Sequence, residues 1–426
     1  MYWSARSNFD RILSPGLNVL LGLALCQSVT AATLCVNPGG TAGCYSKIQD
    51  AVNAAAPFDI ITVKQGTYNE SVIIGKSLSL LGHNPSNTVI DATNLPTGVY
   101  IDGLDNPGLA SVTVTGFTVK NANFEGIVAT NATDVTITDN QVINNNRSLN
   151  INNDTCPGAP DWETAEGFDC GEGIHLSGVD HSVVTENVSQ MNAGGILLSD
   201  DTGPTYDNLI GDNIVTDNPF DCGVTLASHP PASITGALSP FGVYHNTISG
   251  NTSSRNGTQV PGAGAGVGIF DSIPGTKNFG NIIINNVLTN NGLPGVAMHS
   301  HAPGQDLTNN LIVGNTIAGN GADTEDAFTP GPTGINVFGV SPAAGTVIAN
   351  NIIKNESVDI AVNTPASVSA HLNNLQGKSM GILNIGVGTA DATENWWGCP
   401  GGPGANGCST VSGPGITFSP WLTKPF

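Results

Sequence analysis

Histidine and aspartate residues recur at equivalent positions of a repeated sequence phrase, and they are the residues of this chain best suited to acid–base chemistry. Aligning the chain on the phrase Gly-apolar-x-apolar places nine of them on or beside one column: His175, Asp180, His181, Asp200, Asp201, His229, Asp271, His299 and His301. Only 11% of the residues are charged. This concentration of titratable groups is therefore the main functional signal in the sequence.

Three kinds of chemistry suit such residues if successive repeats are stacked strands, which lie about 4.8 Å apart. Two carboxylates about 5–10 Å apart can cleave a glycosidic bond, one as acid and the other as base or nucleophile. A histidine can transfer a proton near neutral pH. Histidine and aspartate side chains that converge from three repeats can hold a divalent metal ion.

We expect five catalytic residues, namely the carboxylates Asp200, Asp201 and Asp271 and the proton-transfer groups His229 and His299. Five further residues are expected to bind substrate: His175, Asp180, Phe270, His301 and Phe338. The aromatic rings of this set can stack against sugar faces, or they can pack only on one another. The alternative for the whole column is aspartates that cap turns and histidines at the surface. His299 and His301 also form a candidate metal pair, which needs a third ligand.

The phrase that orders these residues alternates with a second phrase, in which Asn is followed closely by apolar residues. The first phrase begins at residues 126, 173, 195, 223, 266, 295, 334, 359 and 381. The second begins at Asn140, Asn187, Asn213, Asn246, Asn286, Asn315, Asn351 and Asn374. The shortest unit is 22 residues, from 173 to 195. Apolar and small polar residues alternate within each unit, as in a half-buried strand, and turn residues separate the strands.

Units of about 20–25 residues made of short strands and turns predict a parallel β-solenoid. Its hand is expected to be right, as for parallel crossovers in general. Asn tolerates left-handed turn conformations, and its amide can bond to the Asn one coil away. We therefore interpret the Asn column as structural.

In these repeats the chain resembles the pectin-lyase-like superfamily of right-handed parallel β-helices, including proteins with NosD-type repeats. The resemblance implies an all-β, single-stranded right-handed parallel β-helix over residues 58–390. Residues 48–56 are expected to form a short helix that caps the N-terminal end. We expect residues 1–31 to be a signal peptide, residues 32–57 the N-terminal cap and residues 391–426 the C-terminal cap.

The motifs of known activities on this fold are only partly present. Pectate-type lyases use an Arg or Lys base with calcium, and no Arg or Lys lies on the His/Asp column. Polygalacturonases carry an Asp pair and Gly-His-Gly, of which only Asp200–Asp201 and the single His229 match. Alginate epimerases use Tyr-Gly-Phe-Asp-Pro-His, and residues 166–171 lack its Tyr and His. The resemblance therefore indicates the fold more closely than the reaction.

Three units carry insertions between the Asn phrase and the next Gly phrase, at residues 140–173, 246–266 and 315–334, and a fourth insertion follows His229. The three fall in the same part of the coil and are expected to project from one side. Loops on one face of a rigid scaffold are a usual place for function, although neutral insertion is the alternative. We interpret the acidic segments 154–172 and 323–326 as solvated loops, with calcium binding as the alternative.

The charge balance excludes some partners. Twelve Lys and Arg residues against 33 Asp and Glu residues give a formal net charge of −21 at pH 7. Such a field repels phosphate backbones, so we expect no nucleic-acid partner. It also disfavours bare polyanionic glycans unless a cation bridges them.

The N-terminal residues and the cysteines both suggest export. Arg6 and Arg11 precede an apolar run at 17–26 and small residues at 28–32, which is the pattern of a secretory signal peptide. No other segment is apolar for about 20 residues, so we expect no transmembrane segment in the mature chain. Short Gly/Pro-rich loops suggest three disulfides, Cys35–Cys44, Cys156–Cys170 and Cys399–Cys408, which suit an oxidising compartment. Cys222 is left over, as a buried thiol or a reactive one.

We therefore expect a secreted or periplasmic carbohydrate-active enzyme that cleaves glycosidic bonds of a polysaccharide or cell-surface glycan lying along the helix face. One alternative is a β-elimination lyase or epimerase with a histidine base and a metal. The others are a non-catalytic glycan-binding surface protein and a periplasmic accessory protein that handles metal through His299 and His301. A divalent cation, calcium or a transition metal, is the one cofactor that these side chains suggest.

Overall fold

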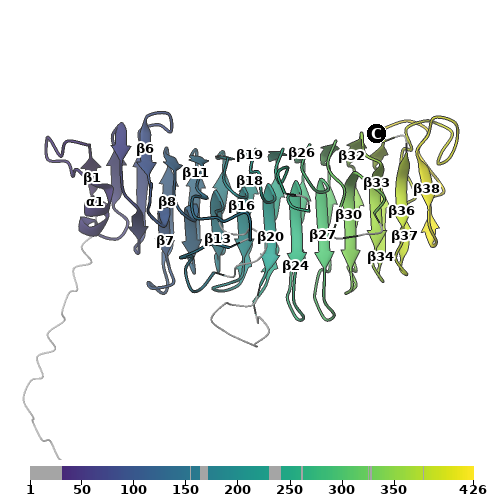
Figure 1. The fold of residues 1–426 in the computed structure, drawn as a ribbon, viewed down its shortest axis with the longest axis horizontal. Helices are drawn as coiled ribbons and strands as arrows, with labels where there is room; N and C mark the ends of the chain where they lie inside the picture. Colours follow the sequence, from purple (N-terminus) through teal and green to yellow (C-terminus); the bar gives the residue numbers. More distant parts are fainter. Residues whose placement is uncertain are drawn as a thin grey trace, which may run out of the picture. The chain divides into compact units, whose positions relative to one another are not determined.

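A computed structural model describes residues 31–153, 155–163, 171–229, 241–260, 262–324, 326, 329–377 and 379–426. The chain from residue 31 winds into a stack of coils, and its strands form three long parallel sheets (Figure 1). Helix α1 (Ile48–Ala54) is the one α-helix among the described residues. The predicted signal peptide lies outside the described residues except for residue 31. Within the described part of the chain, no helix has the length and apolar character needed to cross a membrane.

Each coil contributes one short strand to each sheet. Sheet A contains β1 (Thr33–Val36), β2 (Ile60–Val63), β5 (Leu78–Gly82), β8 (Ala110–Thr115), β11 (Thr133–Thr138), β14 (Val183–Thr185), β18 (Leu209–Gly211), β22 (Thr247–Ser249), β25 (Ile282–Ile284), β28 (Leu311–Val313), β31 (Val347–Ala349), β34 (Ser367–His371), β37 (Thr389–Asp391) and β39 (Ile416–Thr417). Sheet B contains β3 (Gly66–Tyr68), β6 (Thr88–Asp91), β9 (Thr118–Lys120), β12 (Gln141–Ile143), β15 (Val188–Gln190), β19 (Ile214–Thr216), β23 (Thr252–Ser254), β26 (Val287–Thr289), β29 (Thr316–Ala318), β32 (Ile352–Lys354) and β35 (Asn374–Leu375).

Sheet C is formed by the Gly phrase of the sequence. It contains β4 (Val72–Ile74), β7 (Thr97–Asp102), β10 (Glu125–Thr130), β13 (Ile174–Ser177), β16 (Ile196–Ser199), β20 (Val224–Ser228), β24 (Val267–Asp271), β27 (Val296–Ser300), β30 (Thr333–Gly339), β33 (Val358–Asn363), β36 (Met380–Asn384) and β38 (Thr410–Ser412). A small fourth sheet pairs β17 (Thr205–Tyr206) with β21 (Val243–Tyr244).

The core fills the inside of the coils because every second residue of a strand points inward. On β13, Ile174 and Leu176 are fully buried in the main core, and Ile196 and Leu198 lie beside them in register on β16. The residues between them, such as His175, point outward. The predicted alternation is therefore confirmed on sheet C.

Asparagine side chains hold the corners between the sheets in three ladders. The ladder between sheets A and B contains Asn140, Asn187, Asn213, Asn251, Asn286, Asn315, Asn351, Asn373 and Asn395. The ladder between sheets B and C contains Asn145, Asn192, Asn218, Asn256, Asn291 and Asn320 and ends at Glu356. The ladder between sheets C and A contains Asn208, Asn246, Asn281 and Asn310.

The structural interpretation of the Asn column is right, but two of its members were misplaced. Asn246 belongs to the ladder between sheets C and A, and Asn251 occupies its expected position; Asn373, not Asn374, continues the first ladder. The left-handed conformation is adopted by the residue before each of these asparagines, for example Asp212 with a φ of 53° and Gly250 with a φ of 70°. The ladder side chain thus closes the turn that its neighbour makes.

Both ends of the stack are closed by other segments. Helix α1 packs Ile48, Ala51 and Val52 into the core, and the Glu70 carboxylate accepts hydrogen bonds from two backbone N–H groups of its first turn. At the other end, Trp397 is fully buried. Strands β1, β38 and β39 join the sheets, so the sheets continue outside residues 58–390.

Two of the three predicted disulfides are confirmed, Cys35–Cys44 and Cys399–Cys408. Cys156 is also disulfide-bonded, while its predicted partner Cys170 lies outside the described residues. Cys222 is a free cysteine and is buried.

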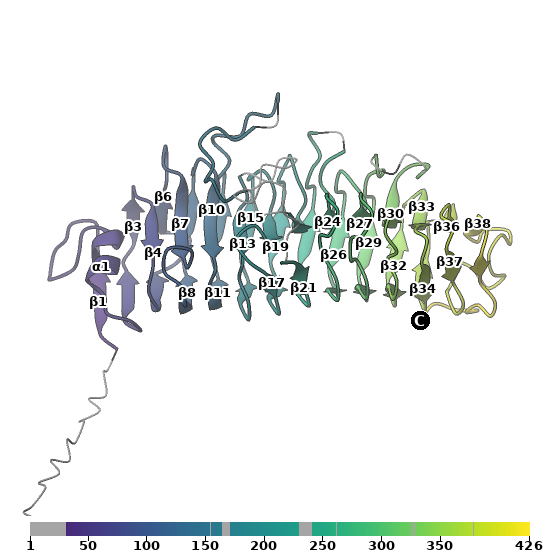
Figure 2. The same ribbon diagram turned by 90° about the horizontal axis from the view of Figure 1, so that it is seen from below.

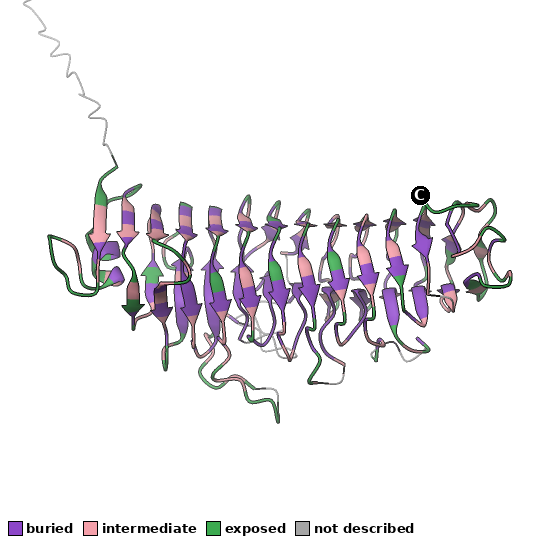
Figure 3. Ribbon diagram, turned by 90° about the horizontal axis from the view of Figure 1, so that it is seen from above, coloured by how far each residue is buried: buried purple, intermediate pink, exposed green. Residues whose placement is uncertain are grey.

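The insertions lie between sheets B and C and project from one side of the stack, as predicted (Figures 2 and 3). They leave the coils after β12, β23 and β29 and return at β13, β24 and β30. The fourth insertion, residues 230–240, lies outside the described residues. The three loops therefore border the outward face of sheet C.

We expect Asn315→Ala to lower the free energy of unfolding by about 3 kcal/mol, because buried polar groups would lose their partners. The Asn315 side chain accepts the backbone N–H and the amide of Asn286 and donates to the Ile283 carbonyl. Urea unfolding measures the change. The control is Thr316→Ala at the next residue, on the outside of sheet B. A loss within about 0.5 kcal/mol of the control would show that the ladder contributes little.

Candidate active site

The outward face of sheet C carries a buried row of polar side chains in the middle coils. Strand pairing places Ser177, Ser199, Ala227, Phe270, His299 and Phe338 in one column. The predicted position of His299 between the two phenylalanines is therefore confirmed. Ser177, Ser199 and His299 are fully buried although they point away from the core. Because water screens charges weakly at a buried site, charged groups on this face interact strongly.

Asp201 and His229 form the first pair on this face. The Asp201 Oδ2 atom lies 3.6 Å from His229 Nδ1, and both side chains are nearly fully buried. Asp200 holds the backbone beside them. Its carboxylate accepts the backbone N–H of His229 at 2.6 Å and the Ser228 hydroxyl at 3.0 Å. The two successive carboxylates thus have different roles. Asp200 fixes the backbone turn at His229, and Asp201 faces the His229 imidazole.

The environment drives the pKa values of Asp201 and Asp271 in opposite directions. Burial alone would raise the pKa of Asp201, but the charge and hydrogen bond of His229, with smaller contributions from His175 and Ser199, lower it to about 2. Burial and the negative charge of Asp200 raise the pKa of Asp271 well above its usual range. The same buried face therefore favours the charged form of Asp201 and the neutral form of Asp271.

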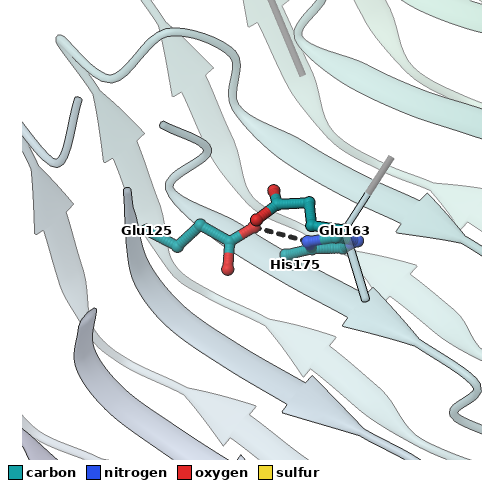
Figure 4. Close-up of side chains that lie close together, drawn as sticks. All are labelled: Glu125, Glu163 and His175. Atoms are coloured by element: carbon teal, nitrogen blue, oxygen red, sulfur yellow. Dashed lines mark hydrogen bonds and ion pairs between the residues drawn. The ribbon is translucent and has the colours of Figure 1, made fainter. Parts of the chain in front are cut away.

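Glu125, Glu163 and His175 form a second cluster, shown in Figure 4. Glu125 begins β10, His175 lies on β13 and Glu163 comes from the insertion between β12 and β13. His175 Nδ1 contacts Glu125 Oε1, and its Nε2 forms a 2.8 Å hydrogen bond with Ser199 Oγ. One ligand atom from each of the three residues lies within 4.8 Å of the other two.

The second cluster corrects part of the sequence interpretation. Segment 154–172 was expected to be a solvated acidic loop, but Glu163 is only 8% exposed and belongs to the cluster. Glu125 was not predicted as a site residue at all. Its only sequence signal is its place directly before the Gly126 phrase, which many structural residues share.

His299 and Asp323 form a third group, two coils beyond His229. His299 Nε2 lies 2.6 Å from Asp323 Oδ2, which also accepts a hydrogen bond from the Asn336 amide at 2.8 Å. Burial raises the pKa of Asp323, but the hydrogen bond and charge of His299 outweigh it, so the pKa is lowered. The rings of Phe270 and Phe338 each pack edge-to-face with the His299 imidazole, with ring centroids 5.1 and 5.5 Å from it.

This third group shows that the acidic segment 323–326 is not a solvated loop either, since Asp323 and Asp326 are 2% and 1% exposed. Asp326 accepts a hydrogen bond from the Asn363 amide. His301 is exposed and lies with its ring centroid 5.3 Å from that of His299. His299 and His301 were predicted as a metal pair that needs a third ligand. Among the described residues, the group of three possible metal ligands is Glu125, Glu163 and His175, which includes neither of these histidines.

Asp180 lies in a different environment. Its carboxylate accepts the Thr133 hydroxyl at 2.7 Å and contacts His181 Nδ1 at 2.6 Å. His181 is exposed and sits edge-on to Tyr206, which begins a stack of rings continued by Tyr244 and Phe279. In this stack the ring faces contact one another, with interplanar angles of 10° and 6°. We therefore interpret the stack as packing between coils at the corner between sheets C and A.

A shallow hollow of about 350 Å³ opens at the corner between sheets B and C. Its lining comes from residues 257–260, 291–292 and 319–321. No residue of this lining carries an acid or an imidazole, so the hollow offers no proton-transfer chemistry. The His/Asp groups on sheet C remain the candidate active site.

Residues 86–274, somewhat less than half of the chain, match the family model described as the right handed beta helix region. Similar solved structures share the fold at low identity. DFA-IIIase from Arthrobacter chlorophenolicus A6 is 13% identical over 85% of this chain and 89% of its own, with a TM-score of 0.53. The Agl-KA catalytic domain is 14% identical over 88% of this chain and 64% of its own, with a TM-score of 0.51.

An α-1,3-glucanase catalytic unit from Streptomyces thermodiastaticus is 14% identical over 88% of this chain and 66% of its own, with a TM-score of 0.50. A comparison with curated proteins found no match. The matched repeat region, the solved structures and the three parallel sheets agree. The chain therefore folds as a right-handed parallel β-helix, as its repeats predicted.

Proposed function

We propose that this chain is an exported carbohydrate-active enzyme that hydrolyses glycosidic bonds of a neutral polysaccharide or cell-surface glycan bound on the outward face of sheet C. One observation carries the proposal: a buried carboxylate and a buried imidazole meet on this face, where Asp201 Oδ2 lies 3.6 Å from His229 Nδ1. A carboxyl group and an imidazole in contact can supply the base and the acid that glycoside hydrolysis requires.

The geometry supports a role for each residue. Protonated His229 gives its proton to the glycosidic oxygen as the bond from that oxygen to the anomeric carbon breaks. A water molecule forms the new bond to that carbon and gives its proton to Asp201, whose carboxylate lies 3.6 Å from the imidazole. The proton then passes from Asp201 to His229 and restores both groups. Asp200 positions His229 by accepting its backbone N–H.

The charge of the face favours a neutral glycan. At the outward positions of strands β13, β16, β20, β24, β27 and β30 there is no Lys or Arg. Carboxylates converge there instead, in a chain of net charge −21. A uronate polymer would meet like charge, whereas the hydroxyl groups of a neutral glycan can hydrogen-bond to carboxylates and imidazoles. The His299 group, with its two phenylalanines, would then hold a sugar residue further along the same chain.

We expect His229→Ala and Asp201→Asn each to lower the rate of glycan cleavage at least about 100-fold, because each removes a proton-transfer group. The assay combines new reducing ends with ultraviolet absorbance of unsaturated products, on a panel of neutral and acidic polysaccharides. His245→Ala and Asp207→Asn change an exposed pair at the corner between sheets C and A, and they serve as matched controls.

Three outcomes would contradict the proposal. Absorbance from unsaturated ends would show a β-elimination lyase instead of a hydrolase. Glycan binding without any product, unchanged in both variants, would show a binding protein. Equal loss of activity in the control pair would show that the effect does not come from the Asp201–His229 pair.

We expect Asp271→Asn and Asp201→Asn to change stability in opposite directions at pH 7.5. The raised pKa of Asp271 means that stability falls as pH rises above about 3.9, so Asp271→Asn should raise Tm at pH 7.5 and have little effect at pH 4. The lowered pKa of Asp201 contributes about 2 kcal/mol above pH 4, which is lost as pH falls toward 2. Asp201→Asn should therefore lower Tm at pH 7.5.

Thermal unfolding of both variants and the parent chain at pH 4 and 7.5 measures these shifts. If Asp271→Asn destabilises the protein equally at both pH values, then the carboxyl group is not held protonated by its surroundings. If Asp201→Asn leaves Tm unchanged at pH 7.5, then the buried pair with His229 does not stabilise the fold.

A further inference from the structure

We propose that Glu125, Glu163 and His175 form a binding site for a divalent transition-metal ion. The three side chains come from strand β10, the insertion after β12 and strand β13, and they meet under the loop. One oxygen of each glutamate and one nitrogen of the histidine lie within 4.8 Å of one another. Figure 4 shows the Glu125 carboxyl group facing the imidazole and the Glu163 carboxyl group beside it. This inference is independent of the glycan hydrolysis proposed above.

The donor set selects the class of ion. Imidazole nitrogen suits zinc, copper, iron and nickel, whereas calcium and magnesium prefer sites made only of oxygen. One histidine with two carboxylates is a donor set that leaves further coordination positions open, as metal sites with a functional role do. We therefore expect zinc to bind and calcium to bind weakly or not at all.

The groups around His175 orient it for such a role. Its Nε2 atom is tied to Ser199 Oγ at 2.8 Å, which fixes the ring plane and turns Nδ1 toward the carboxyl groups. Histidines that bind metals almost always make such a hydrogen bond with their second nitrogen. Ser199 also forms a hydrogen bond with Asp201, so this one serine lies between His175 and the Asp201–His229 pair.

The burial of the three side chains gives an electrostatic reason for an ion to bind. Glu125, Glu163 and His175 are 1%, 8% and 0% exposed. Two carboxylates and one imidazole carry a net negative charge even when the imidazole is protonated, and buried charge is costly unless it is paired or coordinates a metal. A divalent ion balances the two carboxylates and leaves His175 neutral.

An ion bound at this site would also hold the insertion in place. Glu163 lies in the insertion, and the ring of its neighbour Trp162 lies 5.8 Å from the His175 ring. An ion bound by all three side chains would tie this loop to β10 and β13 beside Ser199. It would thereby fix one wall of the candidate active site.

Calorimetric titration of the chelator-treated full chain with zinc chloride tests the proposal, with manganese and calcium chloride as comparisons. We expect one zinc ion per chain, and at least about 100-fold weaker binding in Glu163→Gln and in His175→Asn. Asp323→Asn, at the buried pair with His299, should leave zinc binding unchanged. Zinc should raise the Tm of the parent chain, because an ion that binds only the folded state stabilises it.

Trp162 offers a second readout that does not depend on affinity. Nickel bound at His175 should quench part of the tryptophan fluorescence, and Trp162→Phe should remove that change while it keeps the binding. If His175→Asn does not fold, Glu163→Gln decides the test, because Glu163 lies in a loop. Circular dichroism of each variant without metal confirms that it is folded.

The proposal is overturned if no stoichiometric zinc binds, because the three side chains would then share protons instead of an ion. It is also overturned if Glu163→Gln and His175→Asn both bind zinc as the parent chain does, which would place the ion elsewhere. Calcium binding tighter than zinc would contradict the role of the imidazole. None of these results decides whether the chain cleaves glycans, so this proposal and the proposed function can fail separately.

Discussion

The register between coils is the constraint on which the rest of this molecule depends, and the asparagine ladders hold it. A ladder asparagine accepts from the coil before it and donates to the coil after it, so each buried amide is satisfied only if both neighbours are in register. Shifting one coil by a residue would turn its outward side chains into the core. The ladders at three corners therefore position sheet C, and sheet C positions the chemistry.

The candidate site combines this rigid spacing with partners that come from irregular segments. The strands place His175 and His299 on the outward face, and His229 follows the end of β20. Each histidine meets a carboxylate of different origin: Glu125 begins the preceding strand of sheet C, Asp201 follows β16, and Asp323 comes from an insertion. The β-helix therefore determines the positions of the histidines, while the neighbouring strands, turns and loops supply the carboxylates that act on their charge. Burying so many acids lowers stability, and the regular core and ladders offset that cost.

The repeats were sufficient to predict the fold, because strand alternation and corner asparagines recur in every coil and leave a periodic trace in the sequence. The same periodicity placed Phe270, His299 and Phe338 in one column. It failed where two asparagines occur in one coil, so that Asn246 was placed in the ladder that Asn251 occupies. Both residues head a short strand, and only the pairing of the sheets distinguishes them.

The partners of the histidines could not be predicted in the same way. Glu163 and Asp323 lie in insertions that have no repeat, so nothing in the sequence indicates which coil they fold back on. Composition suggested solvated acidic loops there, since an acidic segment is usually exposed. Burial reverses that inference, because a buried carboxyl group needs a hydrogen-bond partner, an opposite charge or a metal ion. The histidines on and beside the outward face of sheet C are such partners. A long acidic insertion beside a column of outward histidines is thus better interpreted as the cover of a site than as a surface loop.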